Sequence, residues 1–199
     1  MNIAWKLAAA LVLGAVLIGE ASADRTAGEI VRQRCQKCHG LEGRSSDPEF
    51  PKLAGQNADY LTRQLANFKT GVRTSKRMKE RVADLTGGEM RALALYFSEQ
   101  ELGPGAAADT AAVERGRRIY FSGNSANGVT ACTTCHGPQG RGAIYLPRLA
   151  GQHAKYLAAQ LRAFRDQSRS SPNMVMHTVV ENLSEPEIEA VAQFLSTME

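Results

Sequence analysis

Two short segments of this chain place paired thiols next to an imidazole. Both have the form Cys-x-x-Cys-His, with Cys35, Cys38 and His39 in one and Cys132, Cys135 and His136 in the other. This pattern is typical of covalent haem attachment. Two thiols about one helical turn apart can add to the two vinyl groups on one porphyrin edge, and the adjacent histidine supplies a neutral nitrogen to the iron. The sequence therefore predicts two covalently bound haem c groups, with the iron of each held by its motif histidine.

Three other uses of Cys-x-x-Cys have to be weighed. A zinc ribbon pairs two such units about 15–20 residues apart, whereas these units lie in separate halves of the chain. A thioredoxin-like redox motif needs a neighbouring βαβ pattern, which the sequence lacks. Structural disulfides, common in exported proteins, would not require a histidine after each pair. Two matched Cys-x-x-Cys-His copies favour haem over all three.

A methionine further along each half could complete the coordination of the iron. A thioether opposite histidine is typical of electron-transfer cytochromes and raises the reduction potential. In the first half we favour Met78 over Met90, because Met90 falls inside the expected last helix, where methionine commonly fills the core. In the second half two methionines can match Met78. Counted back from the leucine before the last helix (Leu85 or Leu183), the match is Met176, whereas counted forward from the shared phenylalanine (Phe68 or Phe164), it is Met174. We prefer Met176, since the two extra residues of this half most simply fall in the loop 168–173, and Met174 stays the alternative.

The two remaining histidines are expected to face solvent. His153 occupies the position of Asn57 in the first half, and His177 matches Lys79, a residue type typical of surfaces. Ligation of the second iron by two histidines is therefore the less favoured alternative.

The haem motifs belong to an internal repeat that divides the chain in two. Residues 51–56, Pro-Lys-Leu-Ala-Gly-Gln, recur at 147–152 with Arg in place of Lys. Five further positions recur in the same order: Tyr60, Leu61, Gln64, Leu65 and Phe68 in one copy and Tyr156, Leu157, Gln160, Leu161 and Phe164 in the other. A Gly- and Ala-rich stretch between the copies is typical of a linker. The predicted organisation is a first domain at 24–100, a linker at 101–112 and a second domain at 113–199.

Each copy is predicted to be helical. The apolar residues of the shared tyrosine-to-phenylalanine segment recur at the i, i+4, i+7 spacing of one helical face. Thr86-x-x-Glu89 and Ser184-x-x-Glu187 fit the capping box that starts a helix. A first helix is expected from about residue 27 to the first cysteine pair, and its counterpart is expected to start near residue 112. The second copy also carries a Gly/Asn/Ser loop at 123–130 before its cysteines.

Residues 1–23 have the composition of a secretory signal peptide. Lys6 precedes an apolar run, and Ala21-Ser22-Ala23 forms an A-x-A cleavage site. The run is shorter than the ~20 residues that span a bilayer. Cleavage is expected to release an exported chain that is soluble.

The formal net charge is +4, and the basic excess lies in the first copy. Residues 24–100 hold 14 Lys and Arg against 10 Asp and Glu, whereas residues 101–199 hold nine of each. A basic balance can indicate nucleic-acid binding, but an exported compartment argues against that class of partner. The basic run 69–81 is most simply a solvated face, with docking of an acidic partner as the alternative.

With these residues in view, the chain resembles the dihaem cytochrome c4 family over essentially the whole mature sequence. The resemblance rests on both Cys-x-x-Cys-His-Gly segments, the repeated Pro-x-Leu-Ala-Gly-Gln sequence and a methionine followed by Leu-Thr or Leu-Ser before the last helix. It implies an all-α fold of two tandem cytochrome c domains related by a pseudo-twofold axis, with the haems close across the interface. It also implies that the carbonyls of Pro51 and Pro147 accept hydrogen bonds from the motif histidines, which orients the imidazoles.

The resemblance further implies a periplasmic one-electron carrier rather than an enzyme. The expected partners are redox proteins, namely a membrane-bound donor complex and a terminal oxidase, and no nucleic acid. We expect a monomer, with loose association with a membrane allowed. The alternative is the cytochrome subunit of a dehydrogenase, such as a sulfide-oxidising flavocytochrome. A third hypothesis, a peroxidase-like enzyme with one open haem, requires that neither Met174 nor Met176 binds iron.

Overall fold

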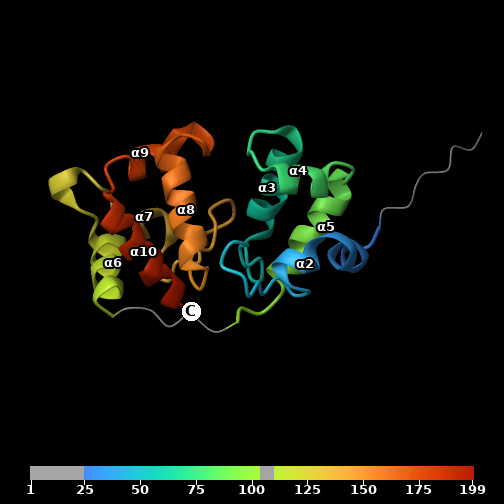
Figure 1. The fold of residues 1–199 in the computed structure, drawn as a ribbon, viewed down its shortest axis with the longest axis horizontal. Coiled ribbons are helices and arrows are strands. Elements are labelled where there is room, and N and C mark those ends of the chain that lie inside the picture. The colour runs from blue at the N-terminus through green and yellow to red at the C-terminus, as the bar shows by residue number, and fades with distance from the viewer. Residues whose placement is uncertain (1–24, 104–109) are drawn as a thin grey trace, which may run out of the picture.

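The computed structural model describes residues 25–103 and 110–199, which form two helical lobes side by side (Figure 1). The expected signal peptide at 1–23 and residues 104–109 of the expected linker lie outside the described residues. Within the described part, extended segments pair only at two isolated bridges, between Asn124 and Val129 and between Ala143 and Leu146. The all-α fold class is therefore confirmed. No helix of the described residues is long and apolar enough to cross a membrane.

In the first lobe the chain up to the haem motif is one helical run. The run begins at a capping box formed by Thr26 and Glu29, and both cysteines lie within it, as the sequence predicts. The successive elements of this lobe are α1 (Ala27–Ile30), the π-helical turn η1 (Val31–Cys35), α2 (Gln36–His39), α3 (Ala58–Thr70), α4 (Lys76–Val82) and α5 (Gly87–Ser98). The predicted capping box of Thr86 and Glu89 starts α5.

In the second lobe the corresponding run is broken in two. The elements of this lobe are α6 (Thr110–Ser122), the 3-10 turn η2 (Ser125–Asn127), α7 (Thr133–His136), α8 (Ala154–Arg165), the 3-10 turn η3 (Pro172–Met174), α9 (Val175–Val180) and α10 (Glu185–Thr197). After α6 the backbone turns at Gly123, where φ is 69°. Asn124 and Val129 then exchange two backbone hydrogen bonds of 2.9 Å, which close the glycine-rich loop. The second cysteine pair therefore lies at the start of the separate helix α7.

Each lobe has its own apolar core. The first core includes Met90, 6% exposed, which fills space as the sequence predicts. In the second lobe α6 crosses α10 very closely at Gly116. A Cβ at Gly116 would lie 1.9 Å from the carbonyl oxygen of Ala190, so only glycine fits at this crossing. The close packing of α6 on α10 gives the second lobe a rigid base for its haem motif.

The two lobes meet along α3 and α8, which face each other in Figure 1. Two arginines cross between the lobes in a reciprocal way. Arg73 donates to the Tyr156 hydroxyl (2.9 Å), and Arg169 donates to the Tyr60 hydroxyl (2.8 Å). Because equivalent residues of the repeat exchange equivalent contacts, the lobes are related by a pseudo-twofold axis.

His153 lies in this interface rather than facing solvent, so that prediction is wrong. It precedes α8, and its Nε2 lies 2.9 Å from the carbonyl oxygen of Ser45 in the other lobe. His177 is also partly covered, with 21% of its side chain exposed and Nδ1 3.2 Å from the carbonyl oxygen of Phe164. Packing across the repeat covers His153, which a residue-by-residue comparison with the other copy cannot show, whereas His177 is covered within its own lobe.

Candidate haem sites

Both motif histidines are buried and oriented by a backbone carbonyl. His39, 7% exposed, ends α2, and its Nδ1 lies 2.9 Å from the carbonyl oxygen of Pro51. His136, 5% exposed, ends α7, and its Nδ1 lies 3.2 Å from the carbonyl oxygen of Pro147. A hydrogen bond donated by Nδ1 leaves Nε2 with its lone pair free for a metal. These are the contacts that the family resemblance implies.

Burial also sets the protonation state of these groups. It lowers the pKa of His39 and His136, against the smaller raising effect of the proline carbonyls, so both rings are neutral as a metal ligand must be. Burial raises the pKa of the Cys35 and Cys132 thiols to about 11. Such thiols are not the low-pKa thiolates of redox-active or thiolate–metal sites. All four cysteines are free of disulfides, so each is available for attachment.

One large cavity joins the two lobes. Its volume is about 1340 Å³, and its walls include all four motif cysteines, both motif histidines, Pro51 and Pro147. Much of the remaining wall is apolar, formed by the inner faces of both cores, for example Leu61, Phe68, Leu157 and Phe164. A cavity with these walls suits large, flat apolar groups anchored at one edge.

The structure places the candidate methionines differently. Met78 and Met176 are half-buried, pack against the first and second core respectively, and line the cavity. Met174 is 37% exposed and is not part of the cavity wall. The Met78 amide donates to the Ser75 hydroxyl (3.3 Å) and the Met176 amide to the Ser171 hydroxyl (2.9 Å), which makes these residues structurally equivalent.

This equivalence locates the two extra residues of the second copy. They fall between Ser171 and Met176, where Asn173 and Met174 both have left-handed backbone conformations, with φ of 53° and 57°. The expected insertion site at 168–173 overlaps this turn. Two left-handed residues in succession form a tight turn that absorbs the extra length before α9, so Met176 keeps the position of Met78.

The cavity also contains buried cations that sequence reasoning missed. The Nε atoms of Arg63 and Arg148 are buried and have no hydrogen-bond partner among the described residues. Arg73 and Arg169 both donate to Gln64 and to Gln160 at the seam between the lobes. Glu49 is the single acidic residue in the cavity wall, and it already pairs with Lys155. A sequence signal for this polar contact between the lobes was available. The polar pairs Tyr60–Gln64 and Tyr156–Gln160 recur within otherwise apolar helical faces.

The arginine nitrogens in the cavity show whether the site suits the charged groups of haem. Each haem carries two propionate carboxylates, and buried arginine nitrogens without a partner are the groups that would receive them. Burial lowers the pKa of Lys52 and of Arg148, which are both in the cavity wall. The thiols, the neutral imidazoles, the apolar walls and the two arginine Nε atoms without a partner together fit two haem groups.

The family model described as Cytochrome c matches residues 26–104 and again 113–199. Cytochrome c4 of Azotobacter vinelandii is 38% identical over 93% of this chain and 94% of its own length. The chain belongs to the cytochrome c4 family. The crystal structure of reduced recombinant cytochrome c4 from Pseudomonas stutzeri superposes with a TM-score of 0.83 at 35% identity, covering 89% of this chain and 100% of that one. A protein named thiosulfate dehydrogenase electron acceptor, from Thiomonas intermedia, is 35% identical over 96% of this chain and 90% of its own length.

As a member of this family the chain binds two covalently attached haem c groups, at the Cys-x-x-Cys-His motifs of its two cytochrome c domains. The related cytochromes support a dihaem electron carrier that exchanges electrons with redox partners.

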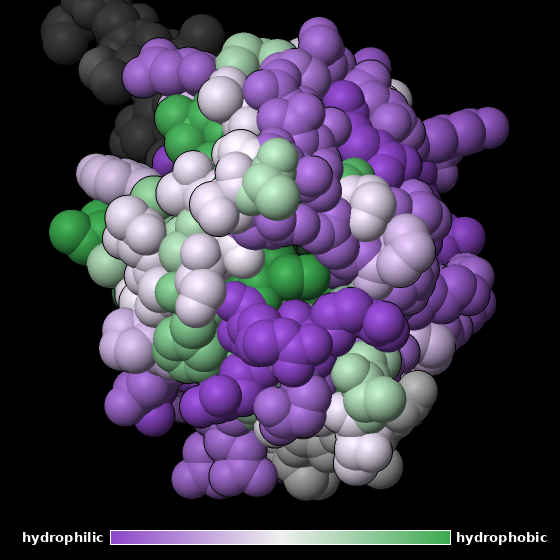
Figure 2. Space-filling view, turned by 90° about the vertical axis from the view of Figure 1, so that its left-hand side faces the viewer, coloured by the Kyte–Doolittle hydropathy of each residue, from purple (hydrophilic) through white to green (hydrophobic). Residues whose placement is uncertain are grey.

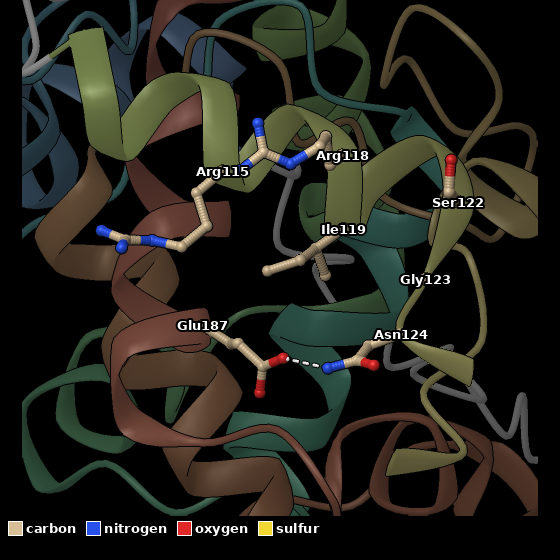
Figure 3. A pocket seen from close by; sticks show the side chains of 7 residues that line it. All are labelled: Arg115, Arg118, Ile119, Ser122, Gly123, Asn124 and Glu187. Atoms are coloured by element: carbon tan, nitrogen blue, oxygen red, sulfur yellow. Dashed lines mark hydrogen bonds between the residues drawn. The ribbon is translucent and has the colours of Figure 1, made fainter. Parts of the chain in front are cut away.

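A second, smaller hollow lies away from the haem motifs, on the face of the second lobe shown in Figure 2, where hydrophilic residues border an apolar recess. Its volume is about 410 Å³, and its lining residues are labelled in Figure 3. Across its base Asn124 donates to Glu187 Oε1 (2.7 Å). Glu187 also closes the capping box of α10. The Asn124–Glu187 hydrogen bond therefore joins the glycine-rich loop to α10, so Glu187 has a structural role in this hollow.

Proposed function

We propose that this chain is a periplasmic one-electron carrier of a respiratory chain, which delivers electrons to a terminal oxidase. The observation that supports it most is the pairing in each lobe of a buried motif histidine with a methionine in the wall of the same cavity. His39 and Met78 would hold one haem iron and His136 and Met176 the other, so that neither iron would be open to a substrate. When bound, each haem supplies one-electron cycling of iron between its ferric and ferrous forms.

The residues of the chain hold this chemistry in place. Cys35, Cys38, Cys132 and Cys135 anchor the porphyrins, and the proline carbonyls fix the planes of the imidazoles. The apolar walls would keep water from a bound haem and would hold the residues that bind its iron in place. Export to the periplasm rests on the signal-peptide pattern of residues 1–23.

The second candidate function is that of the cytochrome subunit of a dehydrogenase, which accepts electrons from the dehydrogenase. Two relatives favour a dehydrogenase as the electron donor. One is named thiosulfate dehydrogenase electron acceptor, and the other, a shorter match, is named cytochrome subunit of sulfide dehydrogenase. The two functions share the same haem chemistry and differ in the donor. Gel filtration of native extract separates them, because a dehydrogenase subunit elutes in a stable complex and a free carrier elutes alone.

A redox titration with optical detection on the purified holoprotein tests the proposal. We expect two one-electron steps, the far-red iron–thioether band in the ferric spectrum at an intensity for two haems, and no reaction with carbon monoxide. Carbon monoxide binding to half of the haems would reject the carrier and bring forward the peroxidase-like hypothesis.

A further inference from the structure

The two methionine-bearing helices present opposite chemistry to solvent. In α4 the residues around Met78 are basic and exposed, and we call them the basic face of α4: Lys76, Arg77, Lys79 and Arg81. Glu80 is the single acidic residue of this helix. None of the four basic side chains has a carboxylate within ion-pair distance in the part of the chain that the structure describes.

The same position in the second lobe is apolar. The residues around Met176 include Val175, 48% exposed, and Met174, 37% exposed, and α9 contains no Lys or Arg. Ile144 and Tyr145, in the segment before Pro147, are also exposed, at 65% and 59%. The two domains therefore share the residues that line the cavity but differ in the exposed residues around Met78 and Met176.

The basic face lies directly at the first haem cavity. Arg77 and Arg81 belong to the cavity wall together with Met78, and the Arg77 guanidinium lies 4.9 Å from the centre of the Phe50 ring, which is also in the wall. Lys76 and Lys79 extend the positive charge outward from the wall. Unpaired charges of one sign next to a cleft attract partners of the opposite sign and raise the rate of encounter.

We propose that the basic face of α4 is the docking surface for an acidic redox protein, which exchanges electrons with the first haem. The second haem exchanges electrons through the apolar surface formed by Met174 and Val175. This inference rests on the proposed electron-carrier function. It adds a path for the electrons through the protein, because the two haems exchange electrons with partners of different surface chemistry.

The test uses the reduced holoprotein, whose low-spin ferrous haems are diamagnetic, and poly-L-glutamate as the acidic probe. In a ¹⁵N-labelled sample at low salt we expect amide shifts to change at residues 74–82 and not on α6. The double variant K76E/K79E should bind the probe at least about 10-fold more weakly. The matched control is R115E/R118E, which reverses two exposed arginines on α6 and should bind the probe as the unmodified protein does.

Shift changes confined to α6 or to α9, or an equal loss of binding in both variants, would overturn the proposal. Lys76 and Lys79 lie outside the cavity wall, so the far-red band should stay unchanged in K76E/K79E. If this variant loses the band, the single variants K76Q and K79Q replace it, each with an expected loss of binding of about threefold. Loss of the far-red band in the unmodified protein would instead reject the proposed function, so the two failures have different readouts.

Discussion

Gln152 of the second lobe makes two hydrogen bonds to the backbone of Lys52 in the first. Its Oε1 accepts from the Lys52 amide (2.8 Å), and its Nε2 donates to the Lys52 carbonyl (2.9 Å). Gln56 repeats both bonds with Arg148, at 2.7 and 2.9 Å. Lys52 and Arg148 directly follow the prolines that orient the motif histidines. The two glutamines therefore fix the position of one haem site relative to the other.

Replacing Gln152 by Ala should free the amide of Lys52. The variant loses two hydrogen bonds between the lobes, at about 1 kcal/mol each, and the Lys52 amide loses its acceptor. Hydrogen exchange followed by NMR should show faster exchange at Lys52, with a smaller change at Arg148, and Gln56→Ala should show the reverse. Gln139→Ala, in an exposed position, is the control. Unchanged exchange at Lys52 would contradict the contact.

Replacing Met176 by Ala should open the second iron. The far-red band should fall to half, carbon monoxide should bind to one haem, and the potential of that haem should drop, because a thioether ligand favours the ferrous state. Met174→Ala should leave the spectrum unchanged, since Met174 lies outside the cavity wall. The opposite pattern would assign Met174 as the ligand.

Replacing Arg148 by Gln should lower the potential of the second haem. The Nε of Arg148 is buried in the cavity wall without a hydrogen-bond partner, so the positive charge of the side chain stabilises negative charge in the cavity and favours the reduced iron. We expect a fall of several tens of millivolts in a redox titration, where ~60 mV is a tenfold change in the equilibrium constant for one electron. Arg117→Gln, on α6, should change neither potential. A rise in potential would reject this role for Arg148.

Acid should destabilise the first lobe partly through Glu89. Hydrogen bonds from Arg25, followed by the amide of Thr86, hold the pKa of the Glu89 carboxyl at about 2, against an ordinary value of 4.5. Because the folded-state pKa is the lower one, the stabilisation is present above about 4.5 and is lost as the pH falls toward 2.

Denaturant unfolding of Glu89→Gln should therefore show a flatter pH dependence between these values than the unmodified protein. The free energies of unfolding of the two proteins should converge at the acid end. Glu80→Gln, an exposed glutamate without an ion pair among the described residues, serves as the control. Parallel pH profiles for Glu89→Gln and the unmodified protein would show that the Arg25–Glu89 pair does not carry the effect.

Much of the fold could be predicted because its signals are local. Helix periodicity in the shared segment, the capping boxes at Thr86 and Ser184, and the glycine-rich loop after α6 all depend on residues a few positions apart. The start of α6 at Thr110 lies within three residues of the expected helix start, a usual uncertainty for a helix end that frays. The position of His153 was missed because its partner, Ser45, belongs to the other copy of the repeat.

By itself the sequence determined the chemistry: two Cys-x-x-Cys-His motifs in a duplicated helical chain predict two attached haems, since attachment needs only the short spacing of thiols and imidazole. Only the tertiary structure decided which methionine lines the second cavity, where the buried arginines gather and how the glutamines tie the lobes together. Those arrangements depend on side chains brought together from distant parts of the chain, and on a left-handed turn at Asn173 and Met174 that shifts the register. Spacing along the sequence favoured Met176 but left Met174 as an alternative, and it carries no information on contacts between the lobes.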